Sequence, residues 1–282
     1  MTTATLNPAH EAWTPRMPAS SSRNSVRFPG ILRSEWIKLR SLRSTVWSYA
    51  VLIVISIGLA ILMAATLNSM AGPFPEDAHV GLLVQISSFP VALGQLIVAV
   101  LGVLIISGEY STGMIRSTFS AVPRRLPVLW AKSAVLFVST FVVGLVATVS
   151  AYLVGSPILA ANGIAAPITD PDVLRAIVGG AFYLALIALF ALGVGTAVRS
   201  SAGGIATVLG ILLILPTILQ LIPADWAQDI LPYLLSDAGL GLVGLQSDIP
   251  GALEPWQQLA VVLGWVAASL TAGAILMKRR DA

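Results

Sequence analysis

Six long apolar runs dominate the sequence and limit what the chain can fold into. A helix needs about 20 predominantly apolar residues to cross the hydrocarbon core of a bilayer. Each run is about this long, and none has an acidic or basic residue near its middle. The sequence therefore predicts an all-α membrane protein with six transmembrane helices. The expected spans are Val46–Leu67, Ile86–Ile106, Val128–Val154, Leu174–Val198, Ala202–Ile222 and Gln257–Met277.

The composition supports the membrane class. Of the 282 residues, 56% are hydrophobic and 10% are charged, whereas a soluble domain carries about 25% charged residues. The chain has no cysteine, which excludes disulfides, thiolate metal sites and cysteine nucleophiles. We expect one membrane domain over residues 30–282. The preceding residues 1–29 are rich in Ser, Thr and Pro, lack the apolar core of a secretory signal, and are expected to form a disordered cytoplasmic tail.

The basic residues predict the orientation of the spans. In a six-span arrangement, 15 of the 16 Lys and Arg residues fall on one side, and Arg175 is the exception. The loops of the other side carry most of the acids. Because cytoplasmic loops retain Lys and Arg, both termini are predicted to be cytoplasmic. Five or seven spans would break this alternation. The net charge of +3 then reflects orientation and contact with anionic membrane lipids, and we expect no nucleic-acid partner, since no basic patch carries interleaved aromatic residues.

The segment before the first span has the pattern of an amphipathic helix. Leu32, Trp36, Leu39 and Leu42 recur at helical spacing, and basic residues occupy much of the remaining surface. Such a helix can lie in the head-group plane. We expect Trp36, Lys38 and Arg40 to be its interfacial residues. The alternative is a charged flank that only sets orientation.

The loop between the second and third spans is predicted to contain a second short helix. Ser107 or Ser111 is a candidate N-cap, and Pro123 would end the helix. Its apolar face would need a groove supplied by a partner, or it would rest on lipid. That face consists of Met114, Ile115, Thr118, Phe119 and Val122.

Several motifs, in this order along six spans, resemble those of the membrane subunit of a type-2 ABC exporter, in the style of high-GC Gram-positive bacterial members. The matching residues are Ser34–Arg40 (SEWIKLR), Gly108–Arg116 (GEYSTGMIR), Pro123–Arg125 (PRR), Lys132 and Leu231–Gly239 (LPYLLSDAG).

The resemblance implies a permease subunit of an ATP-driven exporter in the bacterial plasma membrane, forming the translocation path. The pre-span helix would be a connecting helix. The loop from Glu109 to Phe119 would be a coupling helix that docks on a separate nucleotide-binding ATPase subunit. Two permeases, identical or related, would pair with two such subunits. We expect contact with the ATPase through Glu109, Met114, Ile115, Arg116 and Phe119.

The residues themselves agree that this chain is not an enzyme. A phosphate-binding loop needs a Gly-Lys pair, and none of the three lysines follows a glycine. We therefore expect no cofactor, with ATP bound by the partner subunit. We also expect no metal site, because His10 and His79 have no partners at ligand spacing. An intramembrane enzyme is disfavoured because no span contains His. A scaffold or sensor that holds a partner without moving cargo stays open.

Two further features concern the spans and the outer loops. Gln95 is the in-span polar residue that we expect to face a pathway, and Pro216 is expected to bend the fifth span. The segment from Pro223 to Pro255 is too short to cross the membrane comfortably. We expect it to form re-entrant or surface helices on the outer side, acting as a gate or as a structural plug.

Overall fold

The computed structural model describes residues 28–70, 75–122, 124–161, 163–245 and 253–279, and within these ranges it is helical, without strands. The side chains of Met70, Arg116, Phe119 and Ala121 lie outside this description. The predicted tail of residues 1–29 lies almost wholly outside it as well, because the first helix, α1 (Phe28–Ser41), begins at Phe28.

Six helices of the described chain are long and apolar enough to cross a membrane, as the sequence predicted. The second span, which is α3 together with the 3₁₀ turn before it (Glu76–Ser111), and the third span (Arg125–Ala160) each extend over 36 residues, about 54 Å at 1.5 Å per residue. This length exceeds a hydrocarbon core of about 30 Å, so both helices project beyond it. The spans are α2 (Arg43–Met70), α3 (His79–Ser111), α5 (Arg125–Ala160), α6 (Pro171–Val198), the composite α7–α8 (Ser201–Gln220) and α11 (Pro255–Arg279).

Helix α6 is the centre of the bundle. Of its most apolar stretch, 78% is buried, against 22% for α2. It packs on α3, α5 and α11, and small residues allow close approach at these contacts. A Cβ added at Gly102 of α3 would collide with the carbonyl of Ala188, and one at Gly193 of α6 would collide with Ser269 of α11.

The fifth span is irregular near its centre. Helix α7 (Ser201–Leu209) is followed by a π-helical segment (Gly210–Ile214) and then by α8 (Leu215–Gln220). Pro216 is the second residue of α8, two positions after the end of the π segment. Proline has no N–H and its ring clashes with the carbonyl four residues earlier, which here belongs to Leu212. The predicted disturbance at Pro216 therefore takes the form of a local change in helical hydrogen bonding.

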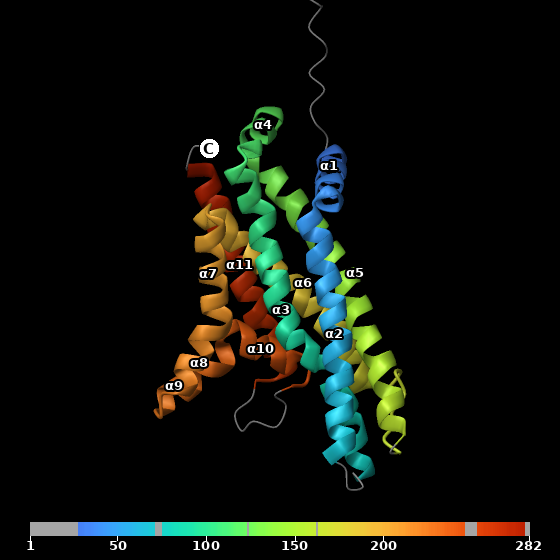
Figure 1. Cartoon of the computed structure of the whole chain (residues 1–282). Helices are drawn as coiled ribbons and strands as arrows, with labels where there is room; N and C mark the ends of the chain where they lie inside the picture. The colour runs from blue at the N-terminus through green and yellow to red at the C-terminus, as the bar shows by residue number, and fades with distance from the viewer. Residues whose placement is uncertain (1–27, 71–74, 123, 162, 246–252, 280–282) are drawn as a thin grey trace, which may run out of the picture.

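The two ends of the bundle carry opposite charge. Helix α1, the loop helix α4 (Met114–Ala121) and the last turn of α11 lie at one end (Figure 1). We call this the basic end, and its described basic residues are Arg33, Lys38, Arg40, Arg43, Arg124, Arg125, Lys132, Arg199, Lys278 and Arg279. We call the opposite end the acidic end, and its described acids include Glu76, Asp77, Asp170, Asp172, Asp225 and Asp229.

Exposed tryptophans mark both ends of the spans. Trp47 and Trp130 are exposed near the basic end, and Trp226 and Trp256 near the acidic end. Aromatic residues with this placement are typical of the two membrane–water interfaces.

The segment after the fifth span divides into an exposed and a buried part. Helix α9 (Asp225–Ile230) lies at the acidic end with Trp226 exposed. It continues through a 3₁₀ turn (Leu231–Tyr233) into α10 (Leu235–Leu242), which packs against α6 and α11. Asp237 of α10 is only 9% exposed and accepts a hydrogen bond from Ser236 Oγ at 3.1 Å. Residues 246–252 lie outside the described structure.

Candidate functional site

Helix α1 packs on α5 through a face that contains a carboxylate. Ile31, Glu35 and Leu39 are its buried residues, and α1 lies beside the first turns of α5. Trp36 and Arg40 point away and are exposed, with Trp36 at 47%. The predicted apolar stripe is thus divided, since Leu39 packs inward while Trp36 does not. The reason is that the buried face of α1 places Glu35 beside Lys132 of α5, whereas Trp36 lies on the exposed face.

The predicted loop helix begins later than expected. Helix α3 continues through Glu109 to Ser111, and Ser111 Oγ donates a hydrogen bond back to the carbonyl of Gly108 at 3.0 Å. Gly113 then adopts the left-handed conformation, with φ of 73°, and α4 starts at Met114. Neither Ser107 nor Ser111 is the N-cap that the sequence suggested. Glu109 belongs to the end of a spanning helix, because the left-handed glycine and not a serine cap separates the two helices.

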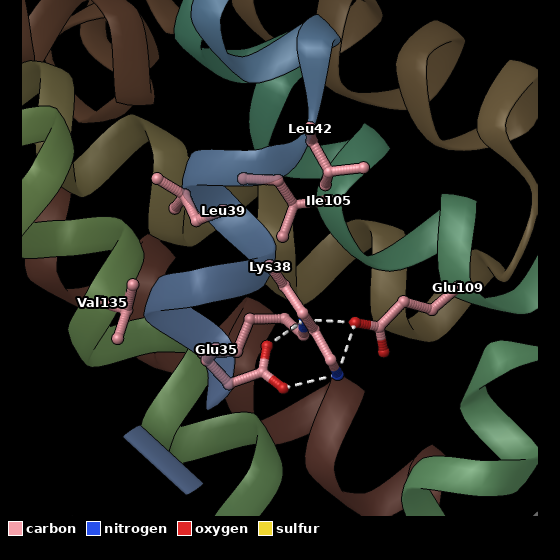
Figure 2. Close-up of a pocket in the computed structure, with 8 residues that line it drawn as sticks. Glu35, Lys38, Leu39, Leu42, Ile105, Glu109 and Val135 are labelled. Carbon is pink, nitrogen blue, oxygen red and sulfur yellow. Dashed lines mark hydrogen bonds and ion pairs between the residues drawn. The ribbon is translucent and has the colours of Figure 1, made fainter. Parts of the chain in front are cut away.

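Four charged side chains meet where α1, α3 and α5 converge (Figure 2). Lys132 Nζ of α5 lies 2.5 Å from Glu35 Oε2 and 2.7 Å from Glu109 Oε1. Lys38 Nζ of α1 lies 2.7 Å from Glu35 Oε1 and 3.1 Å from Glu109 Oε1. Each lysine therefore contacts both glutamates. We call Glu35, Lys38, Glu109 and Lys132 the ion cluster.

The ion cluster is buried and electrically balanced. Side chains of Glu35, Glu109 and Lys132 are 3–4% exposed, and that of Lys38 is 22% exposed. Burial of a charge is costly unless a partner of opposite sign is present, and two lysines here match two glutamates. The cavity that these side chains line measures only about 10 Å³, about one water-sized probe. The ion cluster is therefore a junction between helices and not a cargo pocket.

The pKa shifts of the two α1 residues follow from this pairing. Burial by itself raises the pKa of Glu35, but Lys132 and Lys38 outweigh it and hold that pKa below its ordinary value of 4.5. Burial by itself lowers the pKa of Lys38, but hydrogen bonding and attraction to Glu35 and Glu109 raise it above 10.5. Both groups are therefore held in their charged forms.

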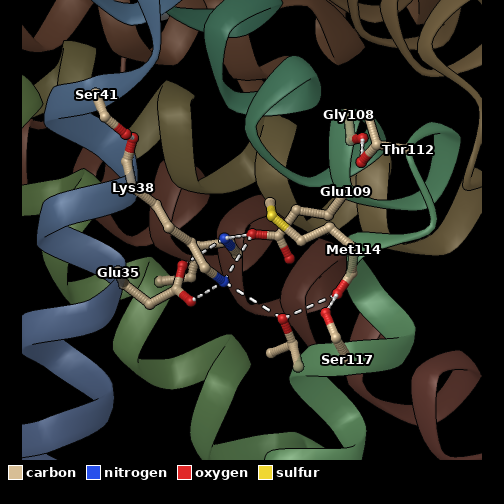
Figure 3. Close-up of polar contacts among 10 residues, drawn as sticks. Glu35, Lys38, Ser41, Gly108, Glu109, Thr112, Met114 and Ser117 are labelled. Atoms are coloured by element: carbon tan, nitrogen blue, oxygen red, sulfur yellow. Dashed lines mark hydrogen bonds and ion pairs between the residues drawn. The ribbon is translucent and has the colours of Figure 1, made fainter.

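The ion cluster also reaches the loop helix. Lys38 Nζ donates a hydrogen bond to Thr118 Oγ1 of α4 at 3.4 Å, and Thr118 Oγ1 donates to the carbonyl of Met114 at 3.2 Å (Figure 3). Ile115 of α4 is 2% exposed and joins the main hydrophobic core. Helix α4 is thus held by a polar contact of Thr118 and by the apolar packing of Ile115. Movement of α4 would therefore also displace α1, α3 and α5.

The comparison with known families identifies the chain. The model of the ABC-2 family transporter protein matches residues 31–215, about two thirds of the sequence. The chain belongs to the ABC-2 transporter family. It is therefore the membrane component of an ABC transporter, a permease, and this family associates with ABC ATPase subunits. A search of curated proteins found no significant match.

The structure separates the residues predicted for coupling in this ABC-2 permease. Glu109 and Ile115 are buried, so they fix the loop helix from inside, whereas Met114 is 38% exposed. Arg116 and Phe119 lie on α4, but their side chains are outside the described structure. Contact of the five residues with an ATPase stays a prediction.

The remaining predicted residues also have defined surroundings. Lys38 belongs to the ion cluster, and its side chain is 22% exposed. Gln95 is 3% exposed, accepts a hydrogen bond from Tyr183 Oη at 2.5 Å and donates one to the carbonyl of Ala92 at 3.0 Å. In this ABC-2 permease Gln95 therefore joins α3 to α6 inside the chain. Among the described residues, no group of His, Cys, Asp or Glu is placed to hold a metal ion.

Sequence reasoning missed Glu35, Lys132 and Thr118 as parts of the site. One signal was available for Lys132. This lysine lies about 10 Å, at 1.5 Å per residue, inside the start of α5, which is the third span of the ABC-2 permease. A lysine at that depth needs a carboxylate nearby. The described acids of the basic end are Glu35 and Glu109, so this requirement alone would have indicated both partners.

A groove of about 330 Å³ lies between α1 and α4 of the permease. Glu35 and Lys38 of the ion cluster are among the residues that line it. Its walls combine apolar and hydroxyl side chains, among them Ile31, Ser34, Met114, Ser117, Thr118 and Val122.

Proposed function

We propose that this ABC-2 permease is the transmembrane subunit of an ATP-driven exporter in a bacterial plasma membrane, and that its basic end faces the cytoplasm. A separate nucleotide-binding subunit would bind and hydrolyse ATP, and a second permease, identical or related, would complete the translocation path. The ion cluster is the observation that supports this proposal best. It connects α1 and α4, the two short helices of the basic end, to the end of α3 and the start of α5.

Transmission of movement is the function that the ion cluster serves in this proposal. Removing one partner from a buried ion pair costs about 3–5 kcal/mol, so α1, α3 and α5 separate only at high cost. A push on α4 acts on α3 through the short Thr112–Gly113 link, and on α1 through Thr118 and Lys38. The three helices would then tilt together and change the opening of the path.

Docking of the ATPase would use the outer surface of α4 and the groove beside it. Met114 is exposed and also lines this groove, so a partner side chain in the groove would touch both α1 and α4. Arg116 and Phe119 are proposed as further contacts on the same helix. Glu109 and Ile115 are buried, and we propose that they contribute to this contact by positioning α4 from inside.

The assignment of ends rests on charge. Cytoplasmic loops retain Lys and Arg, and the described basic end contains ten Lys and Arg residues against two Glu. The chain has no native thiol, so single-cysteine variants test this directly. We expect Arg124→Cys to be labelled only from the cytoplasm and Asp172→Cys only from outside. Asp237 is a poor probe because it is buried.

Co-purification tests the functional proposal. The permease is expressed with a candidate ABC ATPase subunit, the complex is reconstituted, and ATP hydrolysis is measured across candidate cargos. We expect a stable complex whose ATPase rate rises with cargo, and no saturable ATP binding by the permease alone, since it has no phosphate-binding loop. A stable complex whose rate responds to no cargo would favour the scaffold alternative, and ATP binding by the lone permease would contradict the division of labour.

A further inference from the structure

A second pocket at the basic end lies between the start of α5 and the end of α11, apart from the ion cluster. It measures about 540 Å³ and is lined by Arg124, Arg125, Leu126, Pro127 and Lys278. This volume is within the range of small-molecule sites, about 300–1,000 Å³. Among the described residues that line it, three are cations, Leu126 and Pro127 form an apolar wall, and none is an acid.

The cations of this pocket are held by two different spans. Arg125 Nη1 donates a hydrogen bond to the carbonyl of Met277, in the last turn of α11, at 2.9 Å. This bond keeps the guanidinium between α5 and α11. Arg124 and Lys278 are exposed on either side of it. Three cations from two helices thus converge on one space, and a single anion within it would contact both helices.

Backbone electrostatics act in the same direction. The pocket lies at the N-terminus of α5, a helix of 36 residues. The first amide groups of a helix have no intrahelical partner, and the helix dipole favours an anion at this position. The N-cap residue, Arg124, makes no side-chain hydrogen bond to them. Phosphate groups match both arginine side chains and helix N-termini.

The surroundings distinguish a lipid phosphate from a soluble one. Leu126 and Pro127 form an apolar wall, and Trp130, about one turn further along α5, is 51% exposed. Exposed tryptophan at the end of a span lies at head-group level. Basic pockets between spanning helices at this level suit phospholipid head groups. We propose that the pocket between α5 and α11 binds the phosphate of an anionic phospholipid. This inference requires only the membrane position of the chain and is independent of transport.

Lipid titration of the purified full-length permease in a non-ionic detergent tests this site. Binding of phosphatidylglycerol and of phosphatidylcholine is measured by native mass spectrometry for wild type and for the pair R124Q/K278Q. One cation near a membrane surface contributes roughly fivefold, so the pair should weaken phosphatidylglycerol binding roughly 25-fold. Phosphatidylcholine binding should not change. The matched control R33Q/R43Q removes the same charge from exposed positions of α1 and α2 and should bind phosphatidylglycerol as wild type does.

A charge-preserving variant and competition with inorganic phosphate complete the test. The charge-preserving pair R124K/K278R should retain phosphatidylglycerol binding within about twofold if charge attracts the lipid, and it keeps the test valid should R124Q/K278Q fold poorly. Millimolar inorganic phosphate should not displace the lipid. Displacement by inorganic phosphate would indicate a soluble-phosphate site and overturn the proposal. Equal losses in R124Q/K278Q and R33Q/R43Q, or no loss in either, would also overturn it.

Discussion

The two ends of the bundle are held together by different physics. At the basic end, the ion cluster joins three helices through four charged side chains with 22% exposure or less. At the acidic end, α10 is held by shape. The Tyr183 ring fills the space that a side chain at position 239 would need, and Ser88 Oγ donates a hydrogen bond to the carbonyl of Val243 at 2.8 Å.

This difference suggests a division of roles. Buried ion pairs cost much to break and are specific about which helices they join, so they suit a junction that must move as one body. Close packing of Tyr183 on Gly239 resists deformation because interiors are dense and weakly compressible. We propose that the basic end transmits movement and that α10 is a rigid element of the acidic end.

The largest effect is expected from removing one charge of the ion cluster. Lys132→Met leaves two buried glutamates facing each other with one lysine, and the free energy of unfolding should fall by about 3–5 kcal/mol. Thermal unfolding in detergent measures this. Arg40→Met, on the exposed side of α1, is the matched control and should change it by less than about 0.5 kcal/mol. Equal stability of the two variants would mean that the basic end does not depend on buried charge.

A smaller effect is expected from a methyl group at the acidic end. The Cβ of Gly239→Ala would collide with the Tyr183 ring, and overpacking of this kind costs about 1–3 kcal/mol. Gly264→Ala on α11 is the control, because no atom lies within 4 Å of its added Cβ. Helix propensity should make that variant neutral or more stable, by up to about 1 kcal/mol. If both variants behave alike, shape does not hold α10.

The smallest effect is expected in the pH dependence of stability, which should arise at the basic end and not at the acidic end. The pKa of Glu35 is lowered in the folded chain, so its contribution is fully present above about pH 4.5 and is lost as the pH falls through the lowered value. The pKa of Lys38 is raised, so its contribution is fully present below about pH 10.5 and is lost as the pH rises further.

Melting temperature measured across pH tests this expectation. Wild type should keep a plateau between these limits, and Glu35→Gln should lose part of the acid-side decrease. Gly239→Ala should lower the whole curve without changing its shape. An unchanged acid limb in Glu35→Gln would contradict the role given to this carboxylate.

The fold was predictable because it follows from local properties of the sequence. Span length and the absence of central charges indicated six helices, and all six occur. Pro216 indicated where the fifth span becomes irregular. The start of α4 was missed because it depends on Gly113 adopting a left-handed conformation, which competes with the serine caps that the sequence also offers.

The site was only partly predictable because it depends on contacts between distant residues. Lys38 and Glu109 were singled out for lipid and ATPase contact, and these contacts stay predictions. The ion cluster that they join also contains Lys132, which lies 97 positions from Glu35 in the sequence. Periodicity shows which face of α1 is apolar, but it does not show that Glu35 lies on the buried face. That outcome requires α1 to pack on α5 at the level of a buried lysine.

Association with the ATPase tests the coupling role of the basic end most directly. The double variant Arg116→Glu, Phe119→Ala changes α4 without altering the ion cluster, and truncating an aromatic anchor at an interface costs about 2 kcal/mol or more. In a pull-down in mild detergent, we expect wild type to retain the ATPase. The double variant should lose it, while membrane insertion and melting temperature stay those of wild type. Retention of the ATPase by the double variant at the wild-type level would contradict docking through α4.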